Sequence, residues 1–172
     1  MTLPLQPFPL DETKDLVLER ELAVTVAEAW RAYTEPELLK QWFCPLPWKT
    51  VDCKIDLRPG GCFRTVMRSP EGQEFPNEGC YLEIVPQKRL VFTAALDPGF
   101  RPRASAENGA GLLFSAIIEL FPLDGQRCVY RATAIHADQQ GAEQHKAMGF
   151  HQGWGITLDQ LVATMQALRN RV

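Results

Sequence analysis

A carboxylate and a thiol share one side of a strand-like run in the middle of the chain. When side chains alternate along Glu74–Val85, one face carries Glu78, Cys80, Leu82 and Ile84. If this apolar set faces the core, Glu78 points inward, where a carboxylate must be paired or protonated because its burial alone is costly. Such a group is a candidate general acid or base. A wet position at the mouth of a cavity fits the pattern equally well.

A second strand-like run, 127–136, brings two more polar groups to one face. Its even positions include Tyr130, Ala132, Ala134 and His136. The two alanines leave space on that face, so Tyr130 and His136 could donate hydrogen bonds to a molecule bound there. The alternative is that His136 is an ordinary hydrogen-bonding residue at the end of a strand. Cys80 is also a candidate nucleophile, although thiols in apolar surroundings are usually inert.

The histidines and cysteines do not have the spacing of a metal site. His145 and His151 are six residues apart, which on a helix separates them by roughly 120° and prevents an i,i+4 ligand pair. No pair of cysteines forms a C-x-x-C motif, and their spacings do not match a zinc site. The cysteines are Cys44, Cys53, Cys62, Cys80 and Cys128. We therefore predict neither a metal nor a cofactor.

Sequence motifs of common enzymes are missing as well. The chain has no G-x-S-x-G, no P-loop and no G-x-G-x-x-G. No catalytic constellation is recognisable, and whether the protein is an enzyme stays open at this point.

Aromatic residues are numerous for one small core. In a filled core they would pack against one another, whereas in a hollow fold some would line a pocket and Trp or Tyr would orient a ligand by hydrogen bonding. The relevant residues are Trp30, Trp42, Trp48, Trp154, Phe43, Phe63, Phe92 and Phe114.

The longest element is a predicted amphipathic helix at 142–169. Its apolar stripe consists of Phe150, Trp154, Leu158, Leu161, Met165 and Leu168. One flank of the stripe carries Gly149, Gly153, Ala163 and Ala167. Because each helical glycine costs about 1 kcal/mol relative to alanine, we expect something to pack closely there, either the sheet or one wall of a cavity.

The rest of the chain predicts a sheet with two short helices after the first strand. Capping boxes at 25–28 and 34–37 begin the two helices. A first strand is expected at 15–23, followed after the helices by six strands at 50–56, 62–68, 74–85, 89–95, 112–121 and 127–136. Residues 1–15 read as an extended arm, residues 16–172 as one domain, and 97–110 as a polar loop.

Composition limits the possible classes of partner. The 172 residues are 45% apolar and 23% charged with a net charge of −3, which indicates one globular domain with no basic stripe for nucleic acid. The chain shows no signal peptide pattern and no apolar run long enough to cross a membrane. Five cysteines cannot all pair within the chain, so we expect free thiols and a cytoplasmic location.

The order of elements and several short runs resemble a known family. They are similar to the START-like, birch-pollen-allergen-like superfamily and, within it, to the homologues of the heat-shock protein 90 ATPase activator. The similar runs are 29–42, 57–61, 77–84 and 89–93, with Gly153, Trp154, Leu158 and Leu161. The resemblance implies an α+β helix-grip fold, in which a curved antiparallel sheet of about seven strands wraps around the C-terminal helix.

Together these features favour binding of a small hydrophobic or aromatic ligand between the sheet and the C-terminal helix. The expected ligand-binding residues are Trp42, Phe63, Glu78, Cys80, Phe92, Phe114, Tyr130, His136, Phe150, Gly153, Trp154 and Leu158. Two alternatives remain: a module that interacts with a chaperone or another protein, and a cyclase-like or hydrolase-like enzyme that uses Glu78. Exposed strand edges would also allow a homodimer.

Overall fold

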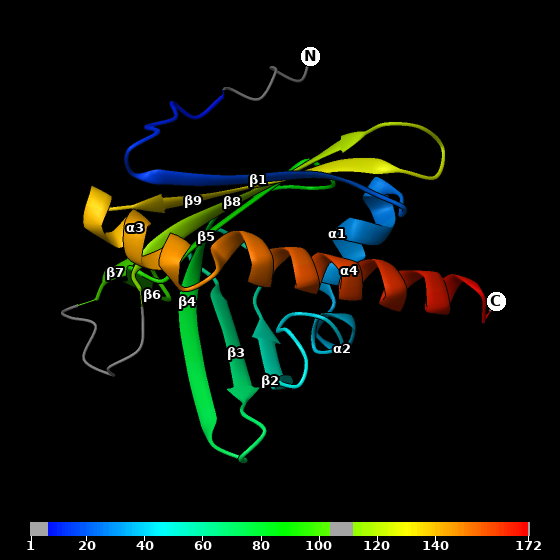
Figure 1. Cartoon of the computed structure of the whole chain (residues 1–172), viewed down its shortest axis with the longest axis horizontal. Coiled ribbons are helices and arrows are strands. Elements are labelled where there is room, and N and C mark those ends of the chain that lie inside the picture. The colour runs from blue at the N-terminus through cyan, green and yellow to red at the C-terminus, as the bar shows by residue number, and fades with distance from the viewer. Residues whose placement is uncertain (1–6, 104–111, 172) are drawn as a thin grey trace.

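A computed structural model describes residues 7–103 and 112–171, and it shows a helix-grip fold. A curved sheet lies behind a long C-terminal helix, with two short helices at one end (Figure 1). The elements are β1 (Asp15–Leu22), α1 (Val26–Thr34), α2 (Pro36–Leu39), β2 (Lys49–Ile55), β3 (Cys62–Arg68), β4 (Glu74–Val85), β5 (Arg89–Thr93), β6 (Leu96–Asp97), β7 (Arg101–Pro102), β8 (Phe114–Pro122), β9 (Cys128–His136), α3 (Gln139–Ala147) and α4 (Phe150–Arg169).

The main sheet has seven antiparallel strands in the order β1-β9-β8-β5-β4-β3-β2. The predicted fold class is confirmed, and β3 and β4 have the predicted bounds. The other strands differ from their predicted bounds by at most two residues at either end, a normal uncertainty for strand ends. The described part of the predicted loop 97–110 contributes to a small β6–β7 hairpin, whereas 104–111 lie outside the described residues, as do residues 1–6 of the predicted arm.

The predicted helix at 142–169 is two helices, so its start was placed wrongly. The backbone of Gly149 has φ of +91°, a left-handed conformation that interrupts the helix between α3 and α4. The glycine that suggested close packing in the sequence therefore provides a turn, and the long helix begins at Phe150.

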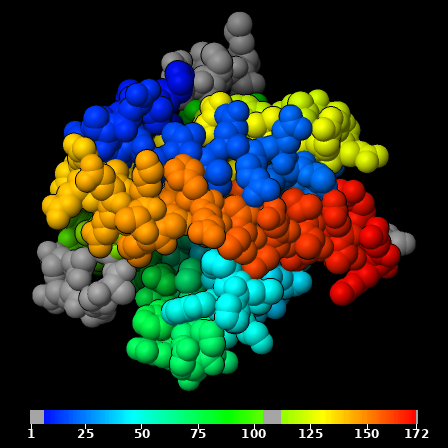
Figure 2. All heavy atoms as spheres, in the orientation of Figure 1, coloured from blue at the N-terminus to red at the C-terminus, as the bar shows by residue number. Residues whose placement is uncertain are grey.

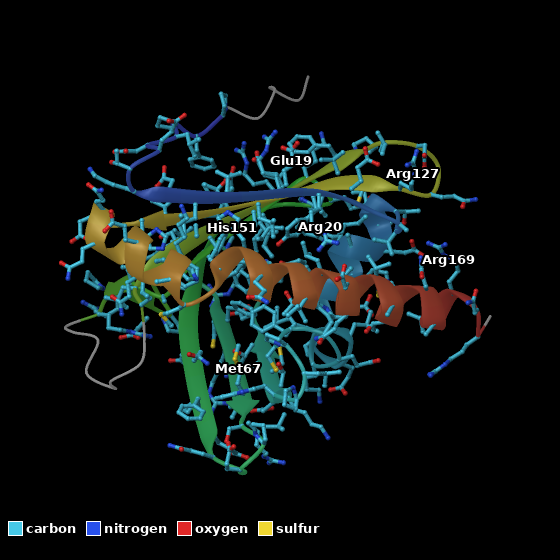
Figure 3. The ribbon with its side chains drawn as sticks, in the orientation of Figure 1. Glu19, Arg20, Met67, Arg127, His151 and Arg169 are labelled. Atoms are coloured by element: carbon cyan, nitrogen blue, oxygen red, sulfur yellow. The ribbon has the colours of Figure 1, made fainter. Side chains whose placement is uncertain are left out.

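Polar contacts fix the first half of α4 against β1. Arg20 on β1 donates to the carbonyl of Gly155 at 2.9 Å and to the carboxylate of Asp159 at 2.7 Å. His151 contacts the carbonyl of Val17 at 3.1 Å, and Figure 3 shows Arg20 and His151 in the space between β1 and α4. These contacts hold the helix along the edge strand, and its apolar stripe faces the sheet.

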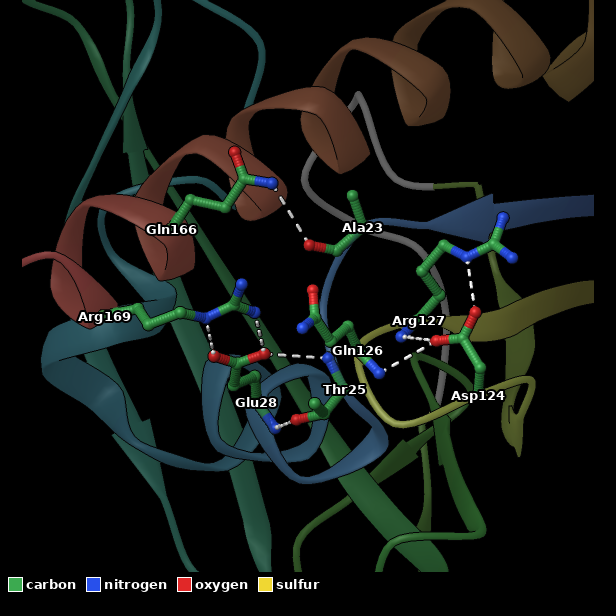
Figure 4. Close-up of polar contacts among 8 residues, drawn as sticks. All are labelled: Ala23, Thr25, Glu28, Asp124, Gln126, Arg127, Gln166 and Arg169. Atoms are coloured by element: carbon green, nitrogen blue, oxygen red, sulfur yellow. Dashed lines mark hydrogen bonds and ion pairs between the residues drawn. The ribbon is translucent and has the colours of Figure 1, made fainter.

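The second half of α4 is attached to α1. Arg169 contacts the two carboxylate oxygens of Glu28 at 2.8 and 2.6 Å, while the same carboxylate accepts from the N–H of Thr25 in the capping box of α1 (Figure 4). Gln166 donates to the carbonyl of Ala23 at 3.1 Å. The space-filling view shows α4 crossing the face between β1 and α1 on one side and α2 with the β3–β4 hairpin on the other (Figure 2).

Candidate functional site

The core between the sheet and α4 contains a hydrogen-bonded chain of aromatic side chains. The indole N–H of Trp154 donates to the hydroxyl of Tyr130 at 2.9 Å. The hydroxyls of Tyr130 and Tyr33 are 2.6 Å apart, and both tyrosines are buried. Burial raises the pKa of Tyr33 to about 12, so the hydroxyl stays protonated and can donate. This chain joins α1, β9 and α4 through polar atoms that all have partners.

A cluster of aromatic rings continues from this chain toward β3 and β4. The ring of Tyr33 packs against Trp42 at 4.8 Å between centroids, and Trp42 packs against Phe43 at 5.6 Å. Phe63 then lies 5.7 Å from Phe43 and 4.8 Å from Phe92. Most of these pairs meet edge to face, the favoured geometry for aromatic side chains.

Tyr81 completes the cluster and has an unusual hydroxyl. Its ring centroid is 5.3 Å from that of Phe63 and 6.4 Å from that of Phe92, and the residue is fully buried. The hydroxyl has no hydrogen-bond partner. Among the described residues, it is the only buried side-chain nitrogen or oxygen without one. Burial raises the pKa of Tyr81 far above its ordinary value, so the group is a neutral donor. A buried donor without a partner is a favourable place for a ligand's acceptor atom.

A second aromatic group surrounds two histidines near the start of α4. His145 on α3 packs against Phe114 at 4.6 Å and Phe150 at 5.0 Å. Its Nδ1 is 2.9 Å from Nε2 of His136, and Nδ1 of His136 is 2.8 Å from the carbonyl of Lys14. Since a carbonyl can only accept, Nδ1 of His136 donates to Lys14, and the remaining nitrogen of His136 shares a hydrogen bond with His145.

The interior affects the protonation of His145. Burial and, to a smaller extent, the neighbouring His136 lower the pKa of His145 to about 4. His136 joins β9 to the segment before β1, and His145 joins α3 to β9. The pair therefore has a structural task that does not require a ligand.

The orientation predicted for β4 is wrong. Phe63 lies opposite Gly79 in the β3–β4 register, and Phe63 and Tyr81 both belong to the core cluster. Glu78 and Cys80 consequently point to the opposite side of the sheet, where Glu78 is exposed and Cys80 is covered. A register shift after Tyr81 lets the second half of the strand bring Ile84 to the core as well. Simple alternation cannot anticipate such a bulge.

The other predicted site residues lie on the helix side of the sheet. Leu158 is fully buried, but the close packing expected at Gly153 is wrong, because a Cβ atom added there would meet nothing within 4 Å. The residues that belong to the core or pack against it are Trp42, Phe63, Phe92, Tyr130, Trp154 and Leu158. Phe114, His136 and Phe150 form the histidine group instead. A shallow depression of about 60 Å³ lies elsewhere, between α2 and the end of α4.

Sequence reasoning did not select Tyr81, Phe43, Tyr33 or the histidine partner His145 as ligand contacts. The hydroxyl contact of Tyr33 with Tyr130 joins residues 97 positions apart, so no local pattern in the sequence indicates it. Gly79 was the available signal for Tyr81, because a glycine inside a strand often marks a bulge or a close approach of two backbones. A Cβ atom at Gly79 would clash with the carbonyl oxygen of Thr93.

Two further observations concern metals and membranes. In residues 7–103 and 112–171, no group of three or more His, Cys, Asp or Glu side chains is placed to hold a metal ion. Within the same described ranges, no helix is long and apolar enough to cross a membrane.

Comparisons with known proteins identify close relatives of this fold. Residues 23–166 match the family model described as activator of Hsp90 ATPase homolog 1-like protein. A crystal structure of a Nitrosomonas europaea protein is 46% identical, with a TM-score of 0.85 over 94% of this chain and 99% of that one. A Rhodobacter sphaeroides protein shares the fold at 20% identity, with a TM-score of 0.76 over 93% of this chain and 97% of that one. No curated protein matches the chain.

Proposed function

Because the chain belongs to the family of activator of Hsp90 ATPase homolog 1-like proteins, we propose that it binds a small aromatic or apolar molecule. The ligand would lie between the sheet and α4, against the rings of Phe63, Phe92 and Tyr81. Affinity would come mainly from apolar burial, at about 25 cal/mol per Å². A hydrogen-bond acceptor on the ligand would receive the hydroxyl proton of Tyr81.

The observation that carries this proposal is the partnerless hydroxyl of Tyr81. The same interior satisfies the hydroxyls of Tyr33 and Tyr130 and the indole of Trp154. The Tyr81 hydroxyl is the exception among these groups, because it is buried beside aromatic rings without a partner. An acceptor atom of a ligand bound there would supply the hydrogen bond that the hydroxyl lost when it left water.

The route to Tyr81 passes the less buried rings. Phe43 and Phe92 are only half-buried, although both pack against the core. In Figure 1, the hairpin end of β3 and β4 extends beyond α4. Because the rings now contact one another, a ligand would separate Phe43, Phe63 and Phe92 as it enters.

A pair of nearly identical probes tests the proposal. α-Tetralone and tetralin have the same bicyclic skeleton, but only α-tetralone carries a carbonyl acceptor. We expect the wild-type protein to bind α-tetralone more tightly in NMR titrations, by roughly 5-fold to 10-fold for one hydrogen bond worth about 1–1.5 kcal/mol. The Tyr81→Phe variant should lose that preference and still bind tetralin. Failure of both probes to shift the resonances of Phe63 and Phe92 would overturn the proposed site.

Native mass spectrometry of the freshly purified protein provides an independent test. A retained molecule, released by denaturation and identified, should contain an aromatic or apolar skeleton with an acceptor atom. Release of a strongly charged, non-aromatic molecule instead would contradict the proposed ligand class.

One observation favours a second candidate function, interaction with a chaperone. Leu46 is 68% exposed, and the exposed Trp48 packs against Phe75 with ring centroids 5.4 Å apart. Exposed apolar side chains that gather in one place are typical of protein contact sites. If this surface acts on an Hsp90-class chaperone, the protein should accelerate the chaperone's ATP hydrolysis, and Trp48→Ala should reduce that effect while Tyr81→Phe leaves it unchanged.

The predicted enzymatic alternative receives no comparable support. Glu78 is exposed on the side of the sheet opposite Tyr81, and its carboxylate is 3.7 Å from the thiol sulfur of Cys62. A general acid or base needs to reach the bound substrate, and Glu78 does not face the proposed site.

A further inference from the structure

We propose that Cys62 and Cys80 are a redox-active pair that oxidises reversibly to a disulfide across β3 and β4. The two residues lie directly opposite each other in the antiparallel register. Side chains at such positions emerge on the same face of the sheet, so the two thiols share the side opposite Tyr81. This inference does not rest on the proposed ligand-binding function.

The backbone hydrogen bonds show which of the two kinds of antiparallel pair Cys62 and Cys80 form. It is the kind with the shorter distance between Cα atoms. The carbonyl of Cys62 accepts from the N–H of Asp56 at 2.9 Å, so it points toward β2. The adjacent Gly61 carbonyl accepts from the N–H of Tyr81 at 3.0 Å, so that bond points toward β4. Cys62 and Cys80 therefore form a non-hydrogen-bonded pair, for which the Cα atoms are about 4.5 Å apart. Disulfides span Cα separations of about 4.4–6.8 Å, so the strands need not move apart.

The two thiols differ in how an oxidant would reach them. Cys62 is 9% exposed, and its sulfur contacts the exposed carboxylate of Glu78. Cys80 is completely buried, and its sulfur is 3.4 Å from the carbonyl of Tyr81. Burial and then the Glu78 carboxylate raise the pKa of Cys62. Cys62 is thus the thiol that meets an external oxidant, and it reacts slowly at neutral pH.

The other cysteines have no thiol opposite them. Cys53 lies opposite Thr65, and Cys128 lies opposite Leu22 and Pro122. Cys44 is outside the strands, where its sulfur accepts a hydrogen bond from Thr50. Among the five cysteines, all within the described residues, Cys62 and Cys80 alone are cross-strand partners.

The reaction uses a low-molecular-weight disulfide as the oxidant. The Cys62 thiol loses its proton to solvent, and the thiolate attacks one sulfur of the oxidant, which forms a mixed disulfide and releases one small thiolate. The Cys80 thiolate then attacks the Cys62 sulfur and releases the second small thiolate. The protein loses two electrons and two protons, and the oxidant becomes two thiols after protonation. An excess of a small thiol reverses both exchange steps and returns the two protein thiols.

Peptide mapping under non-reducing conditions tests the pair directly. We would incubate the purified protein with oxidised and reduced glutathione in different ratios, quench with acid, and digest with trypsin. Arg64 and Arg68 separate the two cysteines, so a bond between them appears as two linked peptides that dithiothreitol releases. We expect this link in the oxidised sample, in a monomer that has lost two hydrogen atoms.

Three variants provide the controls. Cys62→Ser and Cys80→Ser should each abolish the link, whereas Cys53→Ser should retain it, because Cys53 has Thr65 opposite. The wild-type peptide map decides the question even if one variant folds poorly. A glutathione adduct that remains on Cys62, a link to another cysteine, or a link only between two molecules would overturn the proposal.

Discussion

Replacing Tyr81 with phenylalanine should stabilise the protein while weakening its preference for a ligand with an acceptor. The hydroxyl of Tyr81 is buried without a partner in the aromatic cluster. Folding therefore removes the hydroxyl from water and returns no hydrogen bond. Phenylalanine keeps the ring and its contacts with Phe63 and Phe92, and it removes only the group that is penalised.

The size of the effect follows from two opposing contributions. Leaving a buried polar group unpaired costs about 1–3 kcal/mol, which the substitution would recover. Removing the oxygen leaves a small void, and at about 24 cal/mol per Å³ a void of roughly 10 Å³ costs about 0.2 kcal/mol. We expect a net gain in the free energy of unfolding of about 1–2.5 kcal/mol. For a chain of this length the melting temperature should rise by about 2–10 °C.

Urea unfolding, followed by tryptophan fluorescence, measures this gain, and Tyr130→Phe is the matched control. The hydroxyl of Tyr130 is hydrogen-bonded with Tyr33 and Trp154, so its removal leaves the indole N–H without its acceptor. That variant should lose about 1–3 kcal/mol. If Tyr81→Phe is also destabilised, the Tyr81 hydroxyl has a partner in solution, and our reasoning about the site is wrong.

Two other predictions concern pH and the glycines of α4. The pKa of His145 is lowered to about 4 in the folded protein from 6.5. Between these values the unfolded chain binds a proton that the folded state excludes. The unfolding free energy should therefore fall as the pH drops from about 6.5 to about 4, by at most about 1.4 kcal/mol per pH unit, and His145→Gln should show a smaller slope in urea titrations. Gly153→Ala should stabilise α4 by about 0.5–1 kcal/mol because its Cβ meets open space. In the same thermal unfolding assay Gly149→Ala should destabilise by about 1 kcal/mol or more, since φ is +91° there. Equal melting temperatures for the two alanine variants would contradict this.

The fold was largely predictable because its signals are local. Alternation and turn residues located β3 and β4, and the Thr25–Glu28 capping box located the start of α1. The exception was the start of the long helix. Gly149 lies within an otherwise periodic pattern, and sequence alone does not distinguish a helical glycine from one with positive φ.

The candidate site was less predictable because it depends on the face each strand presents. The face of β9 was identified correctly, since Tyr130, Ala132 and Ala134 alternate without interruption and are all buried. The face of β4 was not, because the register shift after Tyr81 divides the strand into two patterns. A shift of one residue exchanges the two faces, so a local irregularity determined whether Tyr81 or Cys80 reached the core.

The corrected orientation of β4 gives its two faces separate chemistry. Tyr81 contributes a neutral donor to the aromatic cluster, and the preceding residue, Cys80, contributes a thiol opposite Cys62 on the other side. Phe63 likewise follows Cys62 in β3. A disulfide would restrain the backbone that carries both rings, so oxidation should make it harder for Phe63 to move away from Phe43 and Phe92 around a ligand. Ligand binding and disulfide formation would then oppose each other. The free energy by which the disulfide weakens ligand binding equals the free energy by which the bound ligand disfavours the disulfide.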